Sequence, residues 1–153
     1  MDLYTHFKQV IFALDDAEVE FLVVGGIALN FYVAPRTTVD IDLMILAQNV
    51  ERAIEALKSL GYRQFDPTMR FGEVLVERLT YMEEGEQFLK VDLLIALGEP
   101  FLSIWHKREF FEYEGRRIGV VSRKGLIELK SLRGSPQDLV DIEKLKGAIG
   151  EEK

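Results

Sequence analysis

Two aspartates interrupt an otherwise apolar stretch near residue 40, and this pattern constrains the fold more than any other in the chain. Thr38–Leu46 is predicted to form a strand on which Asp40 and Asp42 share one face, because side chains two residues apart point the same way. The alternate side chains are expected to point into the core: Val39, Ile41 and Leu43. Neighbouring carboxylates repel each other and are poorly solvated beside apolar groups. A divalent cation relieves both penalties, and Mg²⁺ prefers one or two carboxylates with waters and substrate phosphates.

A second apolar stretch carries a single aspartate. Phe88–Leu97 alternates like a strand with one wholly apolar face, and Asp92 lies on the other face with Lys90. If this strand lies beside the first, Asp92 joins Asp40 and Asp42, and three convergent carboxylates suit the two metal ions of a phosphoryl-transfer centre. Each part also has a plain alternative. An Asp-x-Asp pair occurs by chance at strand ends, and Asp92 could pair with Lys90 or another base.

Gly25 and Gly26 separate a predicted strand, Glu20–Val24, from a predicted helix, Ile27–Tyr32. Backbone amides at such a helix start can bind a phosphate, and a glycine lets the phosphate come close. A Gly-Gly pair after a strand is more often only a turn. The position of this pair, one helix before the two aspartates, favours the phosphate-binding interpretation.

The remaining pattern predicts an α+β protein with one domain over residues 1–153 and a helical C-terminus. Ser135 and Pro136 begin the last helix, with Asp138 placed to reach back to its first turn. A polar hairpin turn is expected at residues 83–86. Further helices are predicted at Leu3–Leu14, Val50–Leu60 and Pro100–His106, and further strands at Glu73–Met82 and Arg117–Val121.

The composition excludes several classes of protein. The net charge of −7 argues against indiscriminate nucleic-acid binding, although residues 103–134 hold eight Lys or Arg against four Asp or Glu. That basic segment either holds an anionic substrate or is a solvated surface. The absence of cysteine excludes disulfides and thiolate metal sites. No stretch has the pattern of a membrane helix or a signal peptide, so we expect a cytoplasmic protein with no membrane partner.

Together the motifs resemble the signature of the DNA polymerase beta-like nucleotidyltransferase superfamily. Val24–Leu29 is similar to its hydrophobic-Gly-(Gly or Ser)-x-Ala motif, and Arg36–Asp42 to its Arg-x-Thr-x-Asp-x-Asp motif. Asp92 falls where the third acid of the family would lie, and Leu129–Ile142 is similar to a Lys-x-x-Arg…Asp-Leu-x-Asp-Ile segment. The resemblance runs from about Phe21 to Leu145. It is closest to small prokaryotic members related to abortive-infection nucleotidyltransferase toxins.

The resemblance implies a mixed β-sheet with flanking helices and transfer of a nucleoside monophosphate from a nucleoside triphosphate to a hydroxyl group. The acceptor is open: RNA such as tRNA, a protein or a small molecule. Mg²⁺ is implied as two ions, with Mn²⁺ as a substitute, held by the catalytic residues Asp40, Asp42 and Asp92. Nucleotide and phosphate contacts are expected from Gly25, Gly26, Arg36, Thr38 and Lys130.

One departure from the family pattern keeps other functions open. Many catalytic members have Gly-Ser where this chain has Gly25-Gly26, so the phosphate contact of a serine hydroxyl is lost. Toxin-like members tolerate the second glycine. The alternative is a non-catalytic or regulatory protein of the toxin-antitoxin type, with an operon-encoded partner protein. A metal-dependent phosphodiesterase would use the same acids with water, although the Gly-Gly helix start favours a triphosphate.

Overall fold

The computed structural model describes residues 2–33, 38–82 and 88–151, which contain both helices and strands. The strands are β1 (Leu22–Val24), β2 (Asp40–Leu46), β3 (Met69–Phe71), β4 (Val74–Met82), β5 (Phe88–Ala96), β6 (Glu109–Tyr113) and β7 (Arg116–Val120). The helices are α1 (Leu3–Asp16), α2 (Gly25–Tyr32), α3 (Val50–Lys58), α4 (Phe101–His106), α5 (Arg123–Arg133) and α6 (Pro136–Glu151), with a 3-10 turn at Ala47–Asn49. The α+β class and the helical C-terminus are therefore confirmed.

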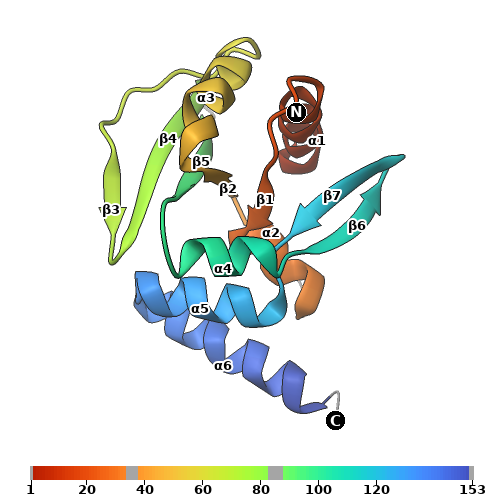
Figure 1. Cartoon of the computed structure of the whole chain (residues 1–153), viewed down its shortest axis with the longest axis vertical. Helices are drawn as coiled ribbons and strands as arrows, with labels where there is room; N and C mark the ends of the chain where they lie inside the picture. Colours follow the sequence, from red (N-terminus) through yellow and green to blue (C-terminus); the bar gives the residue numbers. More distant parts are fainter. Residues whose placement is uncertain (1, 34–37, 83–87, 152–153) are drawn as a thin grey trace.

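All the named strands form one mixed sheet, with helices on both of its sides. The sheet has seven strands in the order β3-β4-β5-β2-β1-β7-β6. Helices α1 and α3 lie on one side, and α4, α5 and α6 stack on the other (Figure 1). The β6–β7 hairpin projects at one edge of the sheet, and the α5–α6 pair carries the chain to its C-terminus (Figure 1).

The strand register brings polar residues from distant segments to neighbouring positions. β2 runs parallel to β5 with Asp42 opposite Asp92, and β1 runs antiparallel to β2 with Val24 opposite Asp42. β4 runs antiparallel to β5 and sets Arg78 opposite Asp92. Since alternate side chains of a strand share a face, these charged residues all lie on the side of the sheet that α5 covers.

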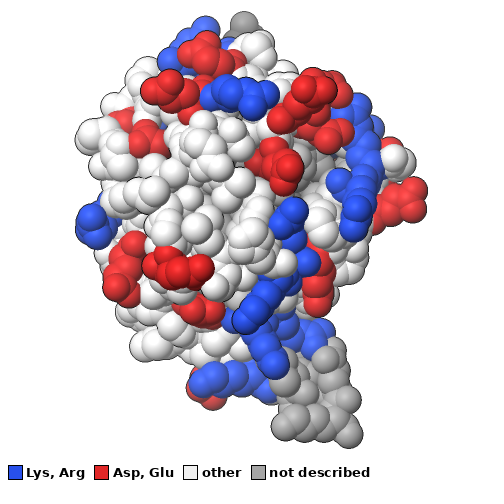
Figure 2. Space-filling model, viewed as in Figure 1, with Lys and Arg blue, Asp and Glu red and all other residues white. Residues whose placement is uncertain are grey.

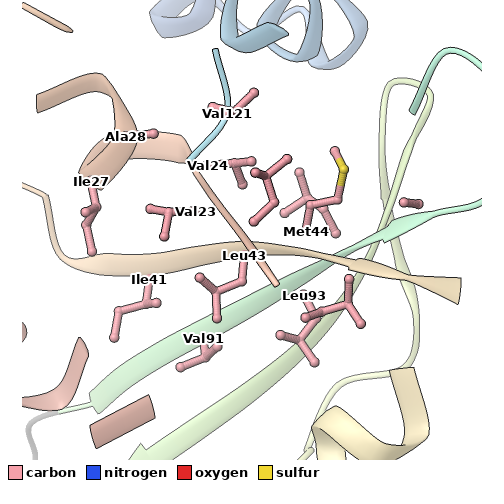
Figure 3. Packing of buried hydrophobic residues seen from close by; sticks show 14 of the residues in the cluster. Val23, Val24, Ile27, Ala28, Ile41, Leu43, Met44, Val91, Leu93 and Val121 are labelled. Carbon is pink, nitrogen blue, oxygen red and sulfur yellow. The ribbon is translucent and has the colours of Figure 1, made fainter. Parts of the chain in front are cut away.

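The other face of the same strands is apolar and contributes to the core. Ile41, Leu43, Val91 and Leu93 have no exposed surface and point toward α1 and α3 (Figure 3). Burying such side chains is the main favourable contribution to folding. The prediction that Val39 joins this core is wrong: its side chain is 66% exposed, because it precedes β2 and lies outside the sheet.

The two C-terminal helices are held by well-defined end structures. α5 begins at Ser122, whose hydroxyl accepts from the Gly125 N–H, and it ends at Gly134, whose φ is +70°. The predicted start of α6 is confirmed. The Asp138 N–H donates to Ser135 Oγ, and the Ser135 N–H donates to the Asp138 carboxylate, which is a capping box.

Strands β3 and β6 and the start of α5 were not predicted from the sequence. β3 has only three residues, and β6 is an edge strand whose side chains are mostly exposed, so neither shows clear alternation. The N-terminal bound of α5 was not predicted because Ser122 is a cap without a glutamate or proline to mark it. The turn predicted at residues 83–86 lies outside the described residues.

Basic residues are spread unevenly over the surface. Figure 2 shows one face of the molecule, on which Lys and Arg side chains gather over the lower half and along the edge where the β6–β7 hairpin lies. Residues 103–134 supply both the hairpin and α5, so the basic segment covers two separate places. Within the described part of the chain, no helix is long and apolar enough to cross a bilayer.

Candidate active site

A pocket of about 600 Å³ opens on the polar side of the sheet, between the strands and α5. Seven of the residues predicted for the site line it: Gly25, Gly26, Thr38, Asp40, Asp42, Asp92 and Lys130. Arg36, the remaining predicted residue, lies outside the described residues. A volume of this size is in the range of small-molecule and nucleotide sites, roughly 300–1,000 Å³.

Both glycines are required by the geometry at the start of α2. Gly25 has a φ of +65°, and a Cβ at this position would overlap the carboxylate of Asp42. A Cβ on Gly26 would overlap the hydroxyl group of Thr38. The first turn of α2 therefore packs directly against the polar residues of β2. Among the residues that the structure describes, no side chain caps this helix start, and the backbone amides at such a start can bind an anion.

The two aspartates of β2 lie in surroundings that disfavour their charged forms. Burial and the charge of Asp92 together raise the pKa of the Asp42 carboxyl to about 7, although the positive charge of Arg133 opposes the rise. Burial and the charge of Asp92 also raise the pKa of Asp40. A raised carboxyl pKa means that the anion lacks compensating positive charge. The pair therefore marks a position where a bound cation would be stabilised.

Asp92 has a partner that the sequence did not reveal. Arg78 donates to both of its carboxylate oxygens, from Nε to Oδ1 at 2.7 Å and from Nη2 to Oδ2 at 2.9 Å. The pair is largely shielded from water, and it is the fork-to-carboxylate geometry that gives the strongest charge-assisted hydrogen bonds. The alternative that Asp92 pairs with a basic side chain is confirmed, with Arg78 and not Lys90 as the partner.

Lys130 lines the pocket, but its ammonium group pairs with two aspartates of α6. Its Nζ is 2.9 Å from Asp141 Oδ2 and 3.6 Å from Asp138 Oδ1, and all three side chains are buried. Asp138 also accepts two hydrogen bonds from Arg133, at 2.6 and 2.9 Å. The hydrogen bonds from Arg133 and Ser135 hold the pKa of Asp138 well below its usual range, although burial alone would raise it. This buried network fixes the C-terminal helices beside the pocket.

Three arginines of the pocket were not predicted from the sequence: Arg70, Arg78 and Arg133. Arg133 lies in the Leu129–Ile142 segment that resembles the family, but the sequence pattern did not place it in the site. Arg78 stands at an alternating position of a predicted strand, which indicates its face but not its neighbour. Only the β4–β5 register shows that it lies opposite Asp92.

The residues present fit one divalent cation better than a three-carboxylate centre. Among residues 2–33, 38–82 and 88–151, no three acidic, His or Cys side chains are grouped as a ready metal site. Asp40 and Asp42 nevertheless share a face, line the pocket and have raised pKa values. Mg²⁺ is commonly held by one or two carboxylates with substrate phosphates, and this pair meets that requirement.

No family model and no curated protein matches the sequence. Solved structures do match its fold. A protein from Thermotoga maritima described as a candidate nucleotidyltransferase aligns with a TM-score of 0.65 at 15% identity, over 97% of this chain and 92% of that one. The lincosamide antibiotic adenylyltransferase LnuA, solved with lincomycin bound, aligns with a TM-score of 0.57 at 21% identity, over 92% and 96%.

A third similar structure is that of ANT(2'')-Ia in complex with adenylyl-2''-tobramycin. It aligns with a TM-score of 0.60 at 15% identity, over 97% of this chain and 90% of that one. At these identities the likeness establishes the fold and not the activity. The chain has the nucleotidyltransferase fold that the sequence motifs led us to expect, while the relation to abortive-infection toxins stays a prediction.

Proposed function

From the nucleotidyltransferase fold of this chain and the residues gathered at its pocket, we propose that it transfers a nucleoside monophosphate from a nucleoside triphosphate to an acceptor hydroxyl. The acceptor oxygen forms a bond to the α-phosphorus, the bond from that phosphorus to pyrophosphate breaks, and the hydroxyl proton is released. The observation that carries the proposal is the contact between Gly25 and Asp42, which joins an uncapped helix start to a pair of poorly compensated carboxylates.

The chain's own residues supply binding and orientation. The first turn of α2 lines the pocket, where its backbone amides can donate to phosphate oxygens, and the missing side chains of Gly25 and Gly26 leave room for close approach. Arg133, fixed by its two bonds to Asp138, adds positive charge to the same pocket. Fixed donors and cations stabilise charge that develops on the leaving group.

Asp40 and Asp42 would hold Mg²⁺, with Mn²⁺ as a substitute. A bound ion of this kind supplies positive charge to the phosphates and orients the α-phosphorus for attack. Asp42 must lose its proton to bind a cation, and its pKa of about 7 makes that loss dependent on pH in the neutral range. We therefore expect transfer to increase as the pH rises through about 7.

The proposed acceptor belongs to one of three classes of molecule that carry hydroxyl groups. Of the similar structures, LnuA was solved with lincomycin bound and ANT(2'')-Ia in complex with adenylyl-2''-tobramycin. A pocket of about 600 Å³ suits a nucleotide, with the acceptor entering from its open side. Small molecules, RNA such as tRNA, and proteins all carry hydroxyl groups, so each is included as an acceptor in the test.

The test is transfer of label from the α-phosphate of each of the four nucleoside triphosphates. The protein is incubated with Mg²⁺ and with total RNA, a protein extract or a panel of polyhydroxylated small molecules. We expect one acceptor pool to become labelled by the wild type and not by Asp40→Asn. The matched control is Asp16→Asn, which neutralises an exposed carboxylate on α1, across the sheet from the pocket, while Asp15 still pairs with Arg116.

A different outcome would favour the non-catalytic alternative. The ion pairs that hold Asp92 and Lys130 are compatible with a site that has lost its chemistry. If no pool is labelled, and no triphosphate binds at millimolar Mg²⁺, the enzyme proposal is wrong. A nucleotidyltransferase-fold partner protein of the toxin-antitoxin type then becomes the better account.

A further inference from the structure

The Arg78–Asp92 pair affects how many metal ions the site can hold. The two residues face each other on β4 and β5, and both oxygens of Asp92 accept from the same guanidinium group. The side chains are only 21% and 10% exposed, so water screens the pair weakly. An exposed pair would rearrange easily, whereas this one is held by strand register and by two hydrogen bonds.

A second metal ion would have to displace or approach this guanidinium group. Asp92 lies beside Asp42 across the β2–β5 pairing, which is where a second ion would find its carboxylate. Arg78 lines the same pocket as Asp40 and Asp42, so its positive charge already lies in this part of the site. A divalent cation placed against Asp92 would be repelled by a fixed unit charge at close range. Both carboxylate oxygens of Asp92 already accept hydrogen bonds from Arg78, which leaves fewer lone pairs to coordinate a metal ion.

We infer that Arg78 takes the place of a second metal ion, so that this site binds one divalent cation through Asp40 and Asp42. Asp92 then acts as a positioning residue that holds the guanidinium group, and not as a metal ligand. The inference rests on the proposed function of the pocket and revises the expectation of two ions. It concerns charge and coordination in the site and is tested by counting ions.

The arrangement also gives Arg78 a role toward substrate. An arginine has five N–H groups in a fixed fork, and two of them donate to Asp92. Arg78 lines the pocket, so an anionic oxygen bound there could accept from the other N–H groups of the fork. A guanidinium held in this way provides the positive charge at the reacting phosphate that a second ion would otherwise supply.

The experiment counts Mn²⁺ bound to the purified protein without nucleotide, from the electron paramagnetic resonance signal of the free ion. All titrations are made at pH 8. We expect the wild type to bind one ion. Asp40→Asn should weaken binding of that ion by about tenfold or more, since loss of a ligand costs at least as much as loss of an outer-shell partner. Asp92→Asn should weaken it clearly less than Asp40→Asn does, because only a neighbouring charge is lost.

Variants of Arg78 make the test specific. Arg78→Gln should allow a second ion to bind, and the double variant with Asp92→Asn should lose it again. Arg78→Lys keeps the charge and should bind one ion. Arg70→Gln removes a positive charge from the same pocket without touching Asp92, and it should also bind one ion. Circular dichroism and thermal unfolding confirm that each variant is folded.

Several results would overturn the inference. These are two ions in the wild type, no ion in the wild type at millimolar Mn²⁺, or loss of the single ion in Asp92→Asn. A folded Arg78→Gln protein that still binds one ion contradicts it as well. Should Arg78→Gln not fold, the comparison of wild type with Asp92→Asn still decides. Nucleotidyl transfer with two bound ions would refute only this inference, whereas one bound ion with neither transfer nor triphosphate binding would refute only the proposed function.

Discussion

Substitution of Asp42 by asparagine should stabilise the metal-free protein at alkaline pH, although the side chain lies in the candidate site. Burial and the charge of Asp92 raise the pKa of Asp42 to about 7 from an ordinary value of 3.8. The folded protein therefore holds a proton more tightly than the unfolded chain does. Stability is lost as the pH rises from about 4 to 7, because the carboxylate must ionise in a poorly solvated position.

The size of the effect follows from the shift. A difference of about three pKa units corresponds to about 4 kcal/mol between fully protonated and fully ionised conditions. Roughly 2 to 3 kcal/mol of this is expected between pH 5 and pH 8, where most other carboxylates stay ionised. An asparagine at position 42 has nearly the same shape and does not titrate, so this contribution disappears in the variant.

Urea unfolding in the presence of EDTA measures the effect at the two pH values. The free energy of unfolding of Asp42→Asn relative to the wild type should increase by about 2 to 3 kcal/mol from pH 5 to pH 8. Asp16→Asn, an exposed aspartate on α1, should show a change of less than about 0.5 kcal/mol. If the difference is constant with pH, or changes in the opposite direction, the environment assigned to Asp42 is wrong.

Two further substitutions test the walls of the pocket. Gly25→Ala should lower the free energy of unfolding by about 2 kcal/mol or more and abolish nucleotide binding, since a Cβ at a φ of +65° would also overlap Asp42; near-wild-type urea unfolding would contradict this. Lys130→Met should lower the free energy of unfolding by about 3 to 5 kcal/mol, because it removes the ammonium group that pairs with the buried carboxylate of Asp141. A Lys130→Met protein of unchanged stability that no longer binds triphosphate would instead support the phosphate contact predicted from the sequence.

Much of the site could be predicted because it rests on local patterns. Asp40 and Asp42 share a strand face by simple alternation, and Asp92 interrupts an apolar strand in the same way. Gly25 is fixed by its place between a strand and a helix. The capping box of Ser135 and Asp138 depends on three residues of spacing, so its prediction was also secure.

The partners of these residues could not be predicted in the same way. Arg78 meets Asp92 only through the pairing of β4 with β5, and alternation reveals the face of a side chain but not its neighbour. Lys130 was expected to reach toward a triphosphate, yet its ammonium group is bound by Asp141 on the next helix. In both cases a long-range contact, set by packing, decides what a charged side chain can do.

The most direct test of the account compares triphosphates labelled at the α- and at the γ-phosphate in parallel reactions with Mg²⁺ and the responsive acceptor pool. Nucleotidyl transfer predicts that the acceptor gains the α-label and never the γ-label, that pyrophosphate is released, and that Asp40→Asn abolishes both signals. Transfer of the γ-label to the acceptor would indicate phosphoryl transfer. Release of nucleoside monophosphate to water, with no labelled acceptor, would indicate hydrolysis. Either result would contradict the proposal.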